Sequence, residues 1–303
     1  MQRRRTLLAT LGAAVATAGC FTGDDGPPTD TSRRETDSRD TQSETRDSGT
    51  TGTTPDQSPQ PFSEPLDVGD SSIQLTGPVV QHSFFHRLTP DSLGVTGAPT
   101  DHQFLFIGVG IESEPRPGAS EFTVTTDETT ATAWRSFENQ RVADLGVANG
   151  DYPYSADGED GWLGFDLPAP LSGEPRLEIS VNDGSAATSL PQGTVASLGS
   201  PPPSFTFDEL SYPEEVESGE PIRVRTTVTN EGAGAGTFRA VVNQTGPTNA
   251  PHTNVTPLEP GQSAPWEVSF GAQGADRVTF RFRSADTASE HEVQVGSGGT
   301  TTV

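Results

Sequence analysis

The stretch PIRVRTTVTN, residues 221–230, decides the fold. From Ile222 onward, apolar or threonine side chains occupy every second position, and arginine or threonine fills the positions between them. A period of two residues is typical of an antiparallel strand with one face in a core and the other in solvent. The segment RVTFRFR, residues 277–283, repeats this pattern. Both segments therefore predict half-buried strands of a sheet.

The same kind of strand continues towards the N-terminus, where short runs rich in Val, Ile, Phe and Thr are separated by Gly, Pro and Asp turns. The expected strands are residues 72–76, 79–88, 103–111, 121–126, 130–135, 161–167 and 176–181. These runs predict an all-β chain with two immunoglobulin-like β-sandwich domains in tandem, over residues 66–198 and 199–295. The prolines at 201–203 predict a semi-rigid spacer that restricts how the domains are oriented.

Segments of each predicted domain resemble a known family of immunoglobulin-like domains, which supports the two-domain organisation. The segments FLFIGV (104–109), FTV (122–124) and GWLGFDLP (161–168) resemble the telokin-like immunoglobulin-like domains of surface lipoproteins. The segments YPEEVESGEP (212–221), VTNEG (228–232) and LEPG (258–261) resemble CARDB domains, which are cell-adhesion-related modules of surface proteins. The second resemblance implies a binding or spacing module with no active site.

The N-terminus resembles an export signal, with a basic start, a short apolar run and small residues before a cysteine. Arg4 and Arg5 resemble the pair in twin-arginine signals, and residues 18–20 resemble a lipobox. We expect a signal peptide over residues 1–19, with Cys20 lipidated and the mature chain anchored to the extracellular side of the membrane. The alternative is a plain cleaved signal with a cysteine there by chance.

Residues 20–65 are acidic and rich in Ser and Thr. Such a composition buries too little apolar surface to offset the entropy of ordering, so it predicts a disordered linker that acts as a stalk. The Gly/Thr tail over residues 296–303 is expected to be disordered as well.

Charge and composition exclude several functions. The 303 residues carry 42 acidic and 18 basic side chains, a net charge of −24, and every basic residue is arginine. Without lysine there is no phosphate-binding P-loop lysine or Schiff base, and a single cysteine excludes disulfide frameworks. The negative charge argues against nucleic acid as a partner. Acidity without lysine indicates a halophilic archaeon, because molar salt screens carboxylate repulsion; an ordinary acidic secreted protein is the alternative.

Arginines on strands give the first candidate for a partner-binding surface. Arg277, Arg281 and Arg283 alternate with inward apolar residues, so they project from a sheet face. A cationic face suits an acidic envelope glycan or a surface-layer protein, since guanidinium matches carboxylate and sulfate. The alternative is cross-strand pairing with carboxylates such as Glu290 and Glu292.

An aromatic loop gives the second candidate. Tyr152 and Tyr154 precede Trp162, whose strand parity is opposite to the inward Leu163. Exposed aromatic side chains bind sugars or proteins, whereas the alternative is packing that pins a long loop. The acidic turn at 157–161 departs from calcium-loop spacing, so no metal is expected there.

Asn243 and Asn254 begin N-glycosylation patterns. His82, His86 and His102 are interpreted as separate surface or edge histidines, because residues four apart on a strand lie too far apart to share one ion. We expect no metal and no cofactor.

Enzyme signatures are missing: there is no G-x-S-x-G and no H-E-x-x-H. The sequence therefore predicts a non-catalytic surface lipoprotein for binding, adhesion or envelope contact. Two alternatives stay open: an accessory or assembly subunit of an exported enzyme or transporter, and a lipoprotein that captures a small ligand or metal.

Overall fold

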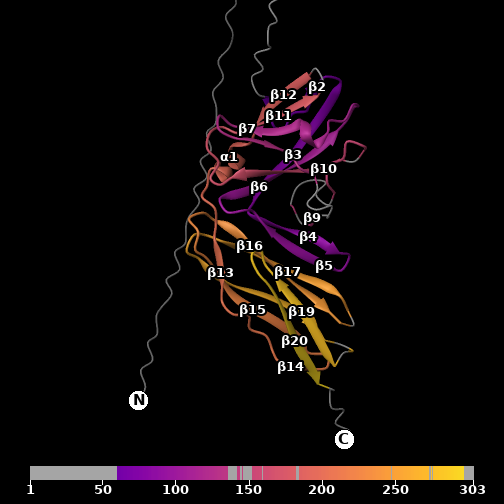
Figure 1. Cartoon of the computed structure of the whole chain (residues 1–303), viewed down its shortest axis with the longest axis vertical. Coiled ribbons are helices and arrows are strands. Elements are labelled where there is room, and N and C mark those ends of the chain that lie inside the picture. Colours follow the sequence, from indigo (N-terminus) through magenta and orange to yellow (C-terminus); the bar gives the residue numbers. More distant parts are fainter. Residues whose placement is uncertain are drawn as a thin grey trace, which may run out of the picture. The chain divides into compact units, whose positions relative to one another are not determined.

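The computed structural model describes residues 60–135, 142–143, 145, 152–158, 160–181, 184–246, 248–272, 274 and 276–296. They fall within one compact unit, Pro55–Val303, and are mostly strands arranged in several sheets (Figure 1). The prediction of an all-β sandwich fold is confirmed. The expected signal peptide, Arg4, Arg5, Cys20 and the linker up to residue 59 lie outside the described residues.

The first sandwich packs two sheets against each other. One has the order β1-β12-β11-β7-β8 and the other β10-β6-β3-β2. The strands are β1 (Gln60–Pro61), β2 (Leu66–Val68), β3 (Ser71–Gln81), β6 (His102–Ile111), β7 (Phe122–Thr125), β8 (Thr130–Thr132), β10 (Gly161–Pro168), β11 (Arg176–Val181) and β12 (Gly184–Ser189). Strand β1 pairs with β12, and Phe62 is buried in the core. The linker predicted to reach residue 65 therefore ends earlier, because Phe62 fills part of the sandwich.

A third sheet, of order β5-β4-β9, lies on the outer face of the second one. It contains β4 (Ser83–Thr89), β5 (Ser92–Gly97) and β9 (Val142–Ala143). The single strand predicted over 79–88 is thus divided at residue 82 between two sheets. Strands β5 and β12, the helix α1 (Gln192–Leu198) and the 3-10 turn η1 (Ala119–Glu121) were not predicted, because their sequences are rich in Gly, Ala, Ser and Thr and carry weak periodicity.

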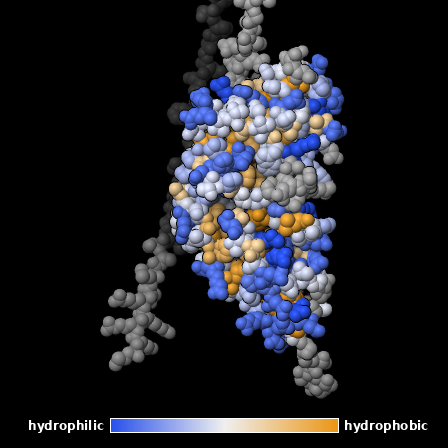
Figure 2. All heavy atoms as spheres, viewed as in Figure 1, coloured by the Kyte–Doolittle hydropathy of each residue, from blue (hydrophilic) through white to orange (hydrophobic). Residues whose placement is uncertain are grey.

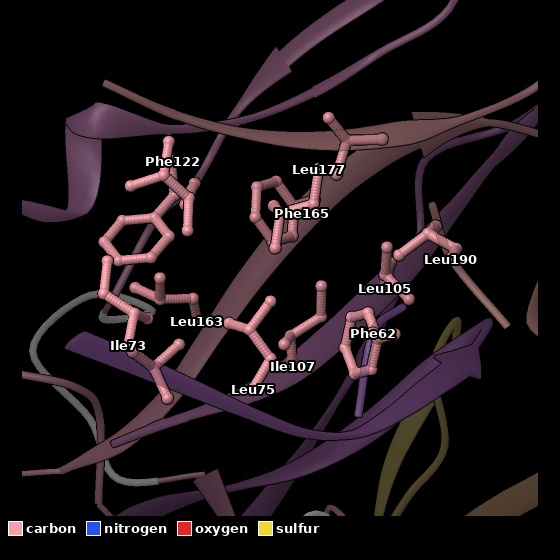
Figure 3. Packing of buried hydrophobic residues seen from close by; sticks show 14 of the residues in the cluster. Phe62, Ile73, Leu75, Leu105, Ile107, Phe122, Leu163, Phe165, Leu177 and Leu190 are labelled. Carbon is pink, nitrogen blue, oxygen red and sulfur yellow. The ribbon is translucent and has the colours of Figure 1, made fainter. Parts of the chain in front are cut away.

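The cores follow from strand alternation. On β6, Leu105 and Ile107 point into the main core with Leu163 and Phe165 of β10 (Figure 3). Phe106 faces the other way, towards Phe84 of β4 in a second apolar cluster. The sheet of β6 and β10 is therefore buried on both faces.

The second sandwich pairs a sheet of order β13-β15-β18 with one of order β14-β20-β19-β16-β17. Its strands are β13 (Phe205–Phe207), β14 (Glu215–Glu217), β15 (Pro221–Asn230), β16 (Gly236–Thr245), β17 (Ala250–Leu258), β18 (Ser263–Gly271), β19 (Arg277–Arg283) and β20 (Ala288–Gly296). Val224, Phe280 and Phe282 are buried, as the alternation predicted, and Trp266 of β18 is buried with them. Gly296 belongs to β20, so the predicted tail begins one residue too early; the rest of it lies outside the described residues.

The proline spacer is fixed to the second sandwich. Asn230 accepts hydrogen bonds at Oδ1 from the backbone N–H groups of Ser204 (3.1 Å) and Gly232 (3.0 Å). A side chain at Gly234 would overlap the carbonyl oxygen of Pro201, so glycine is required where the spacer passes. The spacer therefore rests on the 230–234 turn.

Candidate functional site at the junction of the two sandwiches

The hairpin β4–β5 of the first sandwich lies beside β16 and β17 of the second (Figure 1). Phe85 and Leu93 from the hairpin and Val241 from β16 form one buried apolar cluster. Val241 faces away from its own core, where Ala240 and Val242 point. The hairpin thus covers an apolar position on the outer face of the second sandwich.

A pair of hydrogen bonds reinforces this contact. Oδ1 of Asn243 accepts the backbone N–H of Leu93 at 2.8 Å, and Nδ2 of Asn243 donates to the carbonyl oxygen of Leu93 at 2.8 Å. The carboxamide thereby satisfies both backbone groups of Leu93 on the edge strand β5, as a neighbouring strand would. We call this contact the Asn243–Leu93 clamp.

The clamp contradicts the expectation of a glycan on Asn243. The side chain is only 7% exposed, and its nitrogen already donates to Leu93. The sequence pattern reports a residue type and spacing, not burial, so it gave no sign of this role.

Two hollows flank the contact. The smaller one, of about 260 Å³, lies between the β4–β5 hairpin, including His86 and Val95, and the segment from Arg283 to Ala288. The larger one, of about 340 Å³, is lined by residues 97–102, the spacer with Phe205, and Ala285 and Asp286. Between the two hollows, a Cβ built on Gly97 would lie 2.9 Å from Cβ of Ala285. The segment around Gly97 in the first sandwich therefore touches the segment around Ala285 in the second.

The histidines divide between these hollows. His82 and His102 line the larger one, and His86 lines the smaller. Nδ1 of His102 lies 2.6 Å from a carboxylate oxygen of Asp166, and Nδ1 of His86 lies 2.9 Å from the hydroxyl of Thr96. Among the described residues, no group of three or more His, Cys, Asp or Glu is placed to hold a metal ion.

His82 differs from the other two. Its Nε2 is buried, and none of the described residues forms a hydrogen bond with it. Burial lowers the pKa of His82 below its usual 6.5, and the positive charge of Arg239 on the second sandwich lowers it further. The neutral ring is therefore the form that the junction accommodates.

The predicted arginine surface consists largely of ion pairs. Nη1 of Arg277 lies 3.4 Å from a carboxylate oxygen of Glu292, and Arg281 pairs with Glu290 across β19 and β20. Arg225 pairs in the same way with Glu267 at 2.8 Å. Arg283 stands apart: it lines the smaller hollow, and its Nε is buried with no hydrogen-bond partner in the described part of the chain. The three predicted residues thus lie on one strand but in two different settings.

The aromatic loop is packed rather than displayed, except at one position. Tyr154 and Trp162 are fully buried, whereas Tyr152 is 45% exposed. Trp162 does point away from Leu163, but the aromatic cluster of Phe84, Phe106 and Trp134 covers that face. The expectation of exposed binding aromatics is therefore wrong for Tyr154 and Trp162, because a third sheet occupies the face that the parity assigned to solvent.

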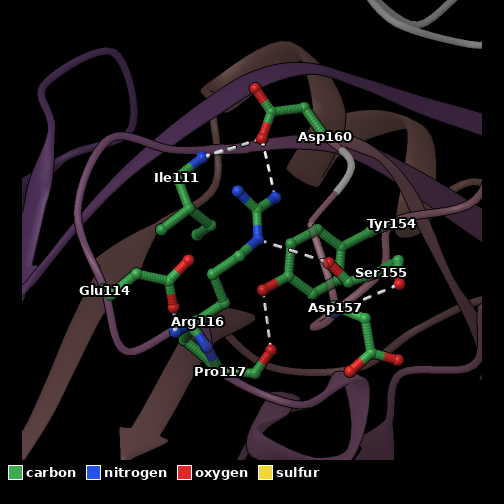
Figure 4. Close-up of polar contacts among 8 residues, drawn as sticks. All are labelled: Ile111, Glu114, Arg116, Pro117, Tyr154, Ser155, Asp157 and Asp160. Carbon is green, nitrogen blue, oxygen red and sulfur yellow. Dashed lines mark hydrogen bonds and ion pairs between the residues drawn. The ribbon is translucent and has the colours of Figure 1, made fainter.

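Polar contacts hold this loop in place (Figure 4). Arg116 donates to Asp160 at 2.8 Å and to the carbonyl oxygen of Ser155 at 3.3 Å, and its guanidinium lies 5.4 Å from the ring centre of Tyr154. The hydroxyl of Tyr154 donates to the carbonyl oxygen of Pro117 at 2.7 Å. Burial raises the pKa of Tyr154 to about 12, despite the opposing charge of Arg116. The acidic turn thus serves, through Asp160, as an anchor for Arg116.

Asn254 lies on β17, the edge strand of the sheet β14-β20-β19-β16-β17. It is half-buried, and its Nδ2 donates to the carbonyl oxygen of Glu267 at 2.9 Å. The indole N–H of Trp266 donates to the carbonyl oxygen of Asn254 at 3.1 Å. These two bonds join the edge strands β17 and β18, so the amide proposed as a glycan acceptor is already used.

One series of side-chain hydrogen bonds was not predicted from the sequence. The hydroxyl of Ser289 lies 2.7 Å from Nε2 of His291, whose Nδ1 lies 2.9 Å from the hydroxyl of Tyr212. The ring of His291 stacks on Phe280. Tyr212 and His291 are distant in sequence, so no local pattern could have found this chain. It satisfies the polar groups at one end of the second core.

On the face of the molecule that Figure 2 shows, hydrophilic residues surround patches of hydrophobic ones. Leu88, near the end of β4 and beside the smaller hollow, is an exposed large apolar side chain. In the part of the chain that the structure describes, no helix has the length and apolar character to cross a membrane.

No family model and no curated protein matches the chain. Among solved structures, a β-glucosidase from Listeria innocua in complex with glucose is similar at TM-score 0.28 and 19% identity; the likeness covers 32% of this chain and 16% of that one. A β-glucosidase from Erythrobacter marinus gives TM-score 0.27 and 14% identity, covering 31% of this chain and 16% of that one. A CARDB domain from Pyrococcus furiosus, in complex with di-metal ions, gives TM-score 0.26 and 14% identity, covering 31% of this chain and 93% of that domain. Likenesses this low support no argument about what the chain does.

Proposed function

We propose that this chain is a non-catalytic, surface-displayed binding module of a halophilic archaeon, with two docked sandwiches that together contact the cell envelope. The observation that carries the proposal is the Asn243–Leu93 clamp. A buried contact between the sandwiches gives a preformed surface to which both contribute, which lowers the entropy cost of binding a partner.

The sequence supports the proposed location. Arg4 and Arg5 suit twin-arginine export, and Cys20 suits a lipid anchor on the extracellular side of the membrane. The Ser/Thr-rich residues that follow would separate the sandwiches from the membrane. A net charge of −24 without lysine suits molar salt.

The partner is proposed to be an envelope glycan or a surface-layer protein. The junction is a better candidate for the contact than the rows of Arg277 and Arg281, whose guanidinium groups already face carboxylates. A paired arginine must first lose its carboxylate before it can bind an acidic ligand, which weakens the net gain.

Two measurements test the proposal. A Cys20→Ala variant should appear in the medium, whereas the unchanged chain should remain with the membrane fraction. The released variant should then bind washed envelopes in molar salt, and Cys20→Ala carrying Asn243→Leu should bind them more weakly. Retention of the Cys20→Ala variant inside the cell, or envelope binding no greater than that of an unrelated acidic protein, would contradict the proposal.

A further inference from the structure

We propose that the smaller hollow at the junction binds a small organic acid, with its carboxylate on Arg283 and a short apolar body against the β4–β5 hairpin. This ligand is separate from the envelope component of the proposed function. The site can therefore exist whether or not the chain contacts the envelope.

Arg283 is a half-buried arginine that pairs with no carboxylate of the described chain. Arg116 is half-buried as well, but its Nη2 lies 2.8 Å from a carboxylate oxygen of Asp160. Arg277 and Arg281 are exposed and still pair with glutamates. Taking a guanidinium out of water is unfavourable unless a counter-charge accompanies it, so a half-buried arginine is normally paired. Arg283 thus keeps the capacity to pair with an external anion.

The terminal nitrogens of Arg283 are the atoms that a ligand can reach. Nε is buried, so it cannot touch a molecule in the hollow. Neither Nη group forms a hydrogen bond within the described chain, and both are open to solvent. Side by side they present two N–H donors, a geometry that matches the two oxygens of a carboxylate. The contact that we expect is therefore an end-on, bidentate pair.

The walls of the hollow are held in place by the fold. Arg283 lies on β19 and is paired in register with Val241 of β16. In the hairpin, a Cβ built on Gly94 would lie 2.4 Å from the ring of His86, so glycine is required where that ring lies over β5. The volume of about 260 Å³ is slightly below the roughly 300 to 1,000 Å³ of ligand pockets, which suits a small molecule and not a length of polymer.

Apolar side chains line part of the hollow. Leu88 is exposed and Val95 is half-buried there, together with Ala285 and Ala288. Ligand sites commonly combine such apolar walls with a few polar groups that fix the orientation of the ligand. Each methylene group that these walls remove from water should tighten binding by up to about fourfold. A carboxylate on a short carbon body therefore uses both parts of the lining.

Asp286 also lines the hollow, but it is exposed and forms no ion pair with Arg283 in the described structure. In molar salt the Debye length is about 3 Å, so an exposed carboxylate that is not in contact with the ligand repels it little. Hydrogen bonds between the guanidinium and a bound carboxylate act at contact distance and are kept. Recognition here depends on direct contact and not on long-range charge.

The test uses the full chain carrying Cys20→Ala in molar NaCl, followed by NMR of the Arg283 side chain. The buried Nε–H should exchange slowly and give a resolved signal, which is assigned by its loss in Arg283→Gln. Acetate should shift this signal saturably with a Kd of the order of 10 mM, and butyrate should bind about fivefold more tightly. Acetamide, which has the same shape without the charge, should give no saturable shift. Leu88→Ser should remove most of the advantage of butyrate.

Variants at Arg283 lack the signal, so their binding is followed by the rise in Tm that a ligand of the folded state produces. The rise with acetate should be absent in Arg283→Gln. Arg283→Lys keeps the charge but loses the planar fork, and should bind about tenfold more weakly. The matched control is Arg277→Gln, on the same strand but paired with Glu292, which should show the full rise.

No saturable shift with acetate or butyrate, an equal shift with acetamide, or an undiminished rise in Tm in Arg283→Gln would each overturn the inference. A response that appears only when chloride is replaced would assign the site to a halide and overturn it as well. Envelope binding without a response to acetate would reject only this inference. Acetate binding without attachment to envelopes would reject only the proposed function.

Discussion

The outer face of the sheet β14-β20-β19-β16-β17 has two halves that differ in what covers them. On β16, Val241 and Asn243 are buried under the β4–β5 hairpin. On β19 and β20, Arg277 and Arg281 pair with Glu292 and Glu290 in solvent. Both halves carry polar residues at outward positions, but the β16 half also carries the apolar Val241; that half is an interface and the other a solvated surface.

The difference teaches that burial, not residue type, sets the energy of a polar contact. Breaking a buried hydrogen bond leaves groups that water cannot reach, at about 1 to 3 kcal/mol for each group. An exposed ion pair is replaced by hydration and contributes about 0 to 1 kcal/mol. We therefore expect the β16 half to control the docking of the sandwiches.

The largest effect is expected from Asn243→Leu. The substitution leaves the N–H and C=O of Leu93 without partners, so the free energy of unfolding should fall by about 2 to 4 kcal/mol. Denaturant unfolding followed by tryptophan fluorescence measures this change. Thr245→Leu, at an exposed outward position of the same strand, is the control and should change stability by less than about 0.5 kcal/mol. Equal effects of the two substitutions would erase the contrast between the halves.

A smaller loss is expected from Gly97→Ala. The added methyl group would press on Cβ of Ala285, so overpacking at the junction should lower the free energy of unfolding by about 1 to 3 kcal/mol. Combining it with Ala285→Gly removes the opposing atom and should restore part of the loss. Thermal unfolding of the single and double variants measures this coupling. Strictly additive effects would show that residues 97 and 285 do not touch in solution.

Lowering the pH should lower the free energy of unfolding through the protonation of His82. The pKa of His82 is lowered in the folded protein by burial and by Arg239, so the unfolded chain binds the proton more readily. The stability that comes from neutral His82 is present above pH 6.5, its usual pKa, and is lost as the pH falls through the folded value. His82→Gln should make the pH dependence shallower. Burial also lowers the pKa values of His252 and His291, so some slope should remain.

The smallest effect is expected on the solvated half. Arg281→Gln removes the pair with Glu290, whose side chains are 49% and 56% exposed, and should cost less than about 0.5 kcal/mol. Molar salt should remove even this effect, since the Debye length falls to about 3 Å. A double-mutant cycle with Glu290→Gln, run at low and at high salt, measures it. A coupling above about 1 kcal/mol in molar salt would show that this half also carries a buried network.

Much of the fold could be predicted from alternation alone. The period of two over residues 221–230 and 277–283 correctly assigned Val224, Phe280 and Phe282 to the core. The strand β5, residues 92–97, has the sequence SLGVTG, whose glycines weaken the pattern. It was missed, and with it the hairpin that forms the junction.

The site was harder to predict because its members are paired across long distances in sequence. Asn243 fits a glycosylation pattern, and only its position opposite Leu93, 150 residues earlier, shows that its amide is used in the fold. The parity of Trp162 was correct, but a strand pattern cannot report that another sheet covers the second face. The local sequence indicates which side chains share one face of a strand. Which other element packs against that face depends on the topology of the whole fold.

Amide hydrogen exchange at Leu93 tests the central claim most directly, namely that the Asn243–Leu93 clamp docks the two sandwiches. Leu93 lies on β5, the edge strand of its sheet, and its N–H is bonded to Asn243. We predict slow exchange at Leu93, comparable to that of core strand amides, and rapid exchange in Asn243→Leu. Rapid exchange at Leu93 in the unchanged chain would contradict the account.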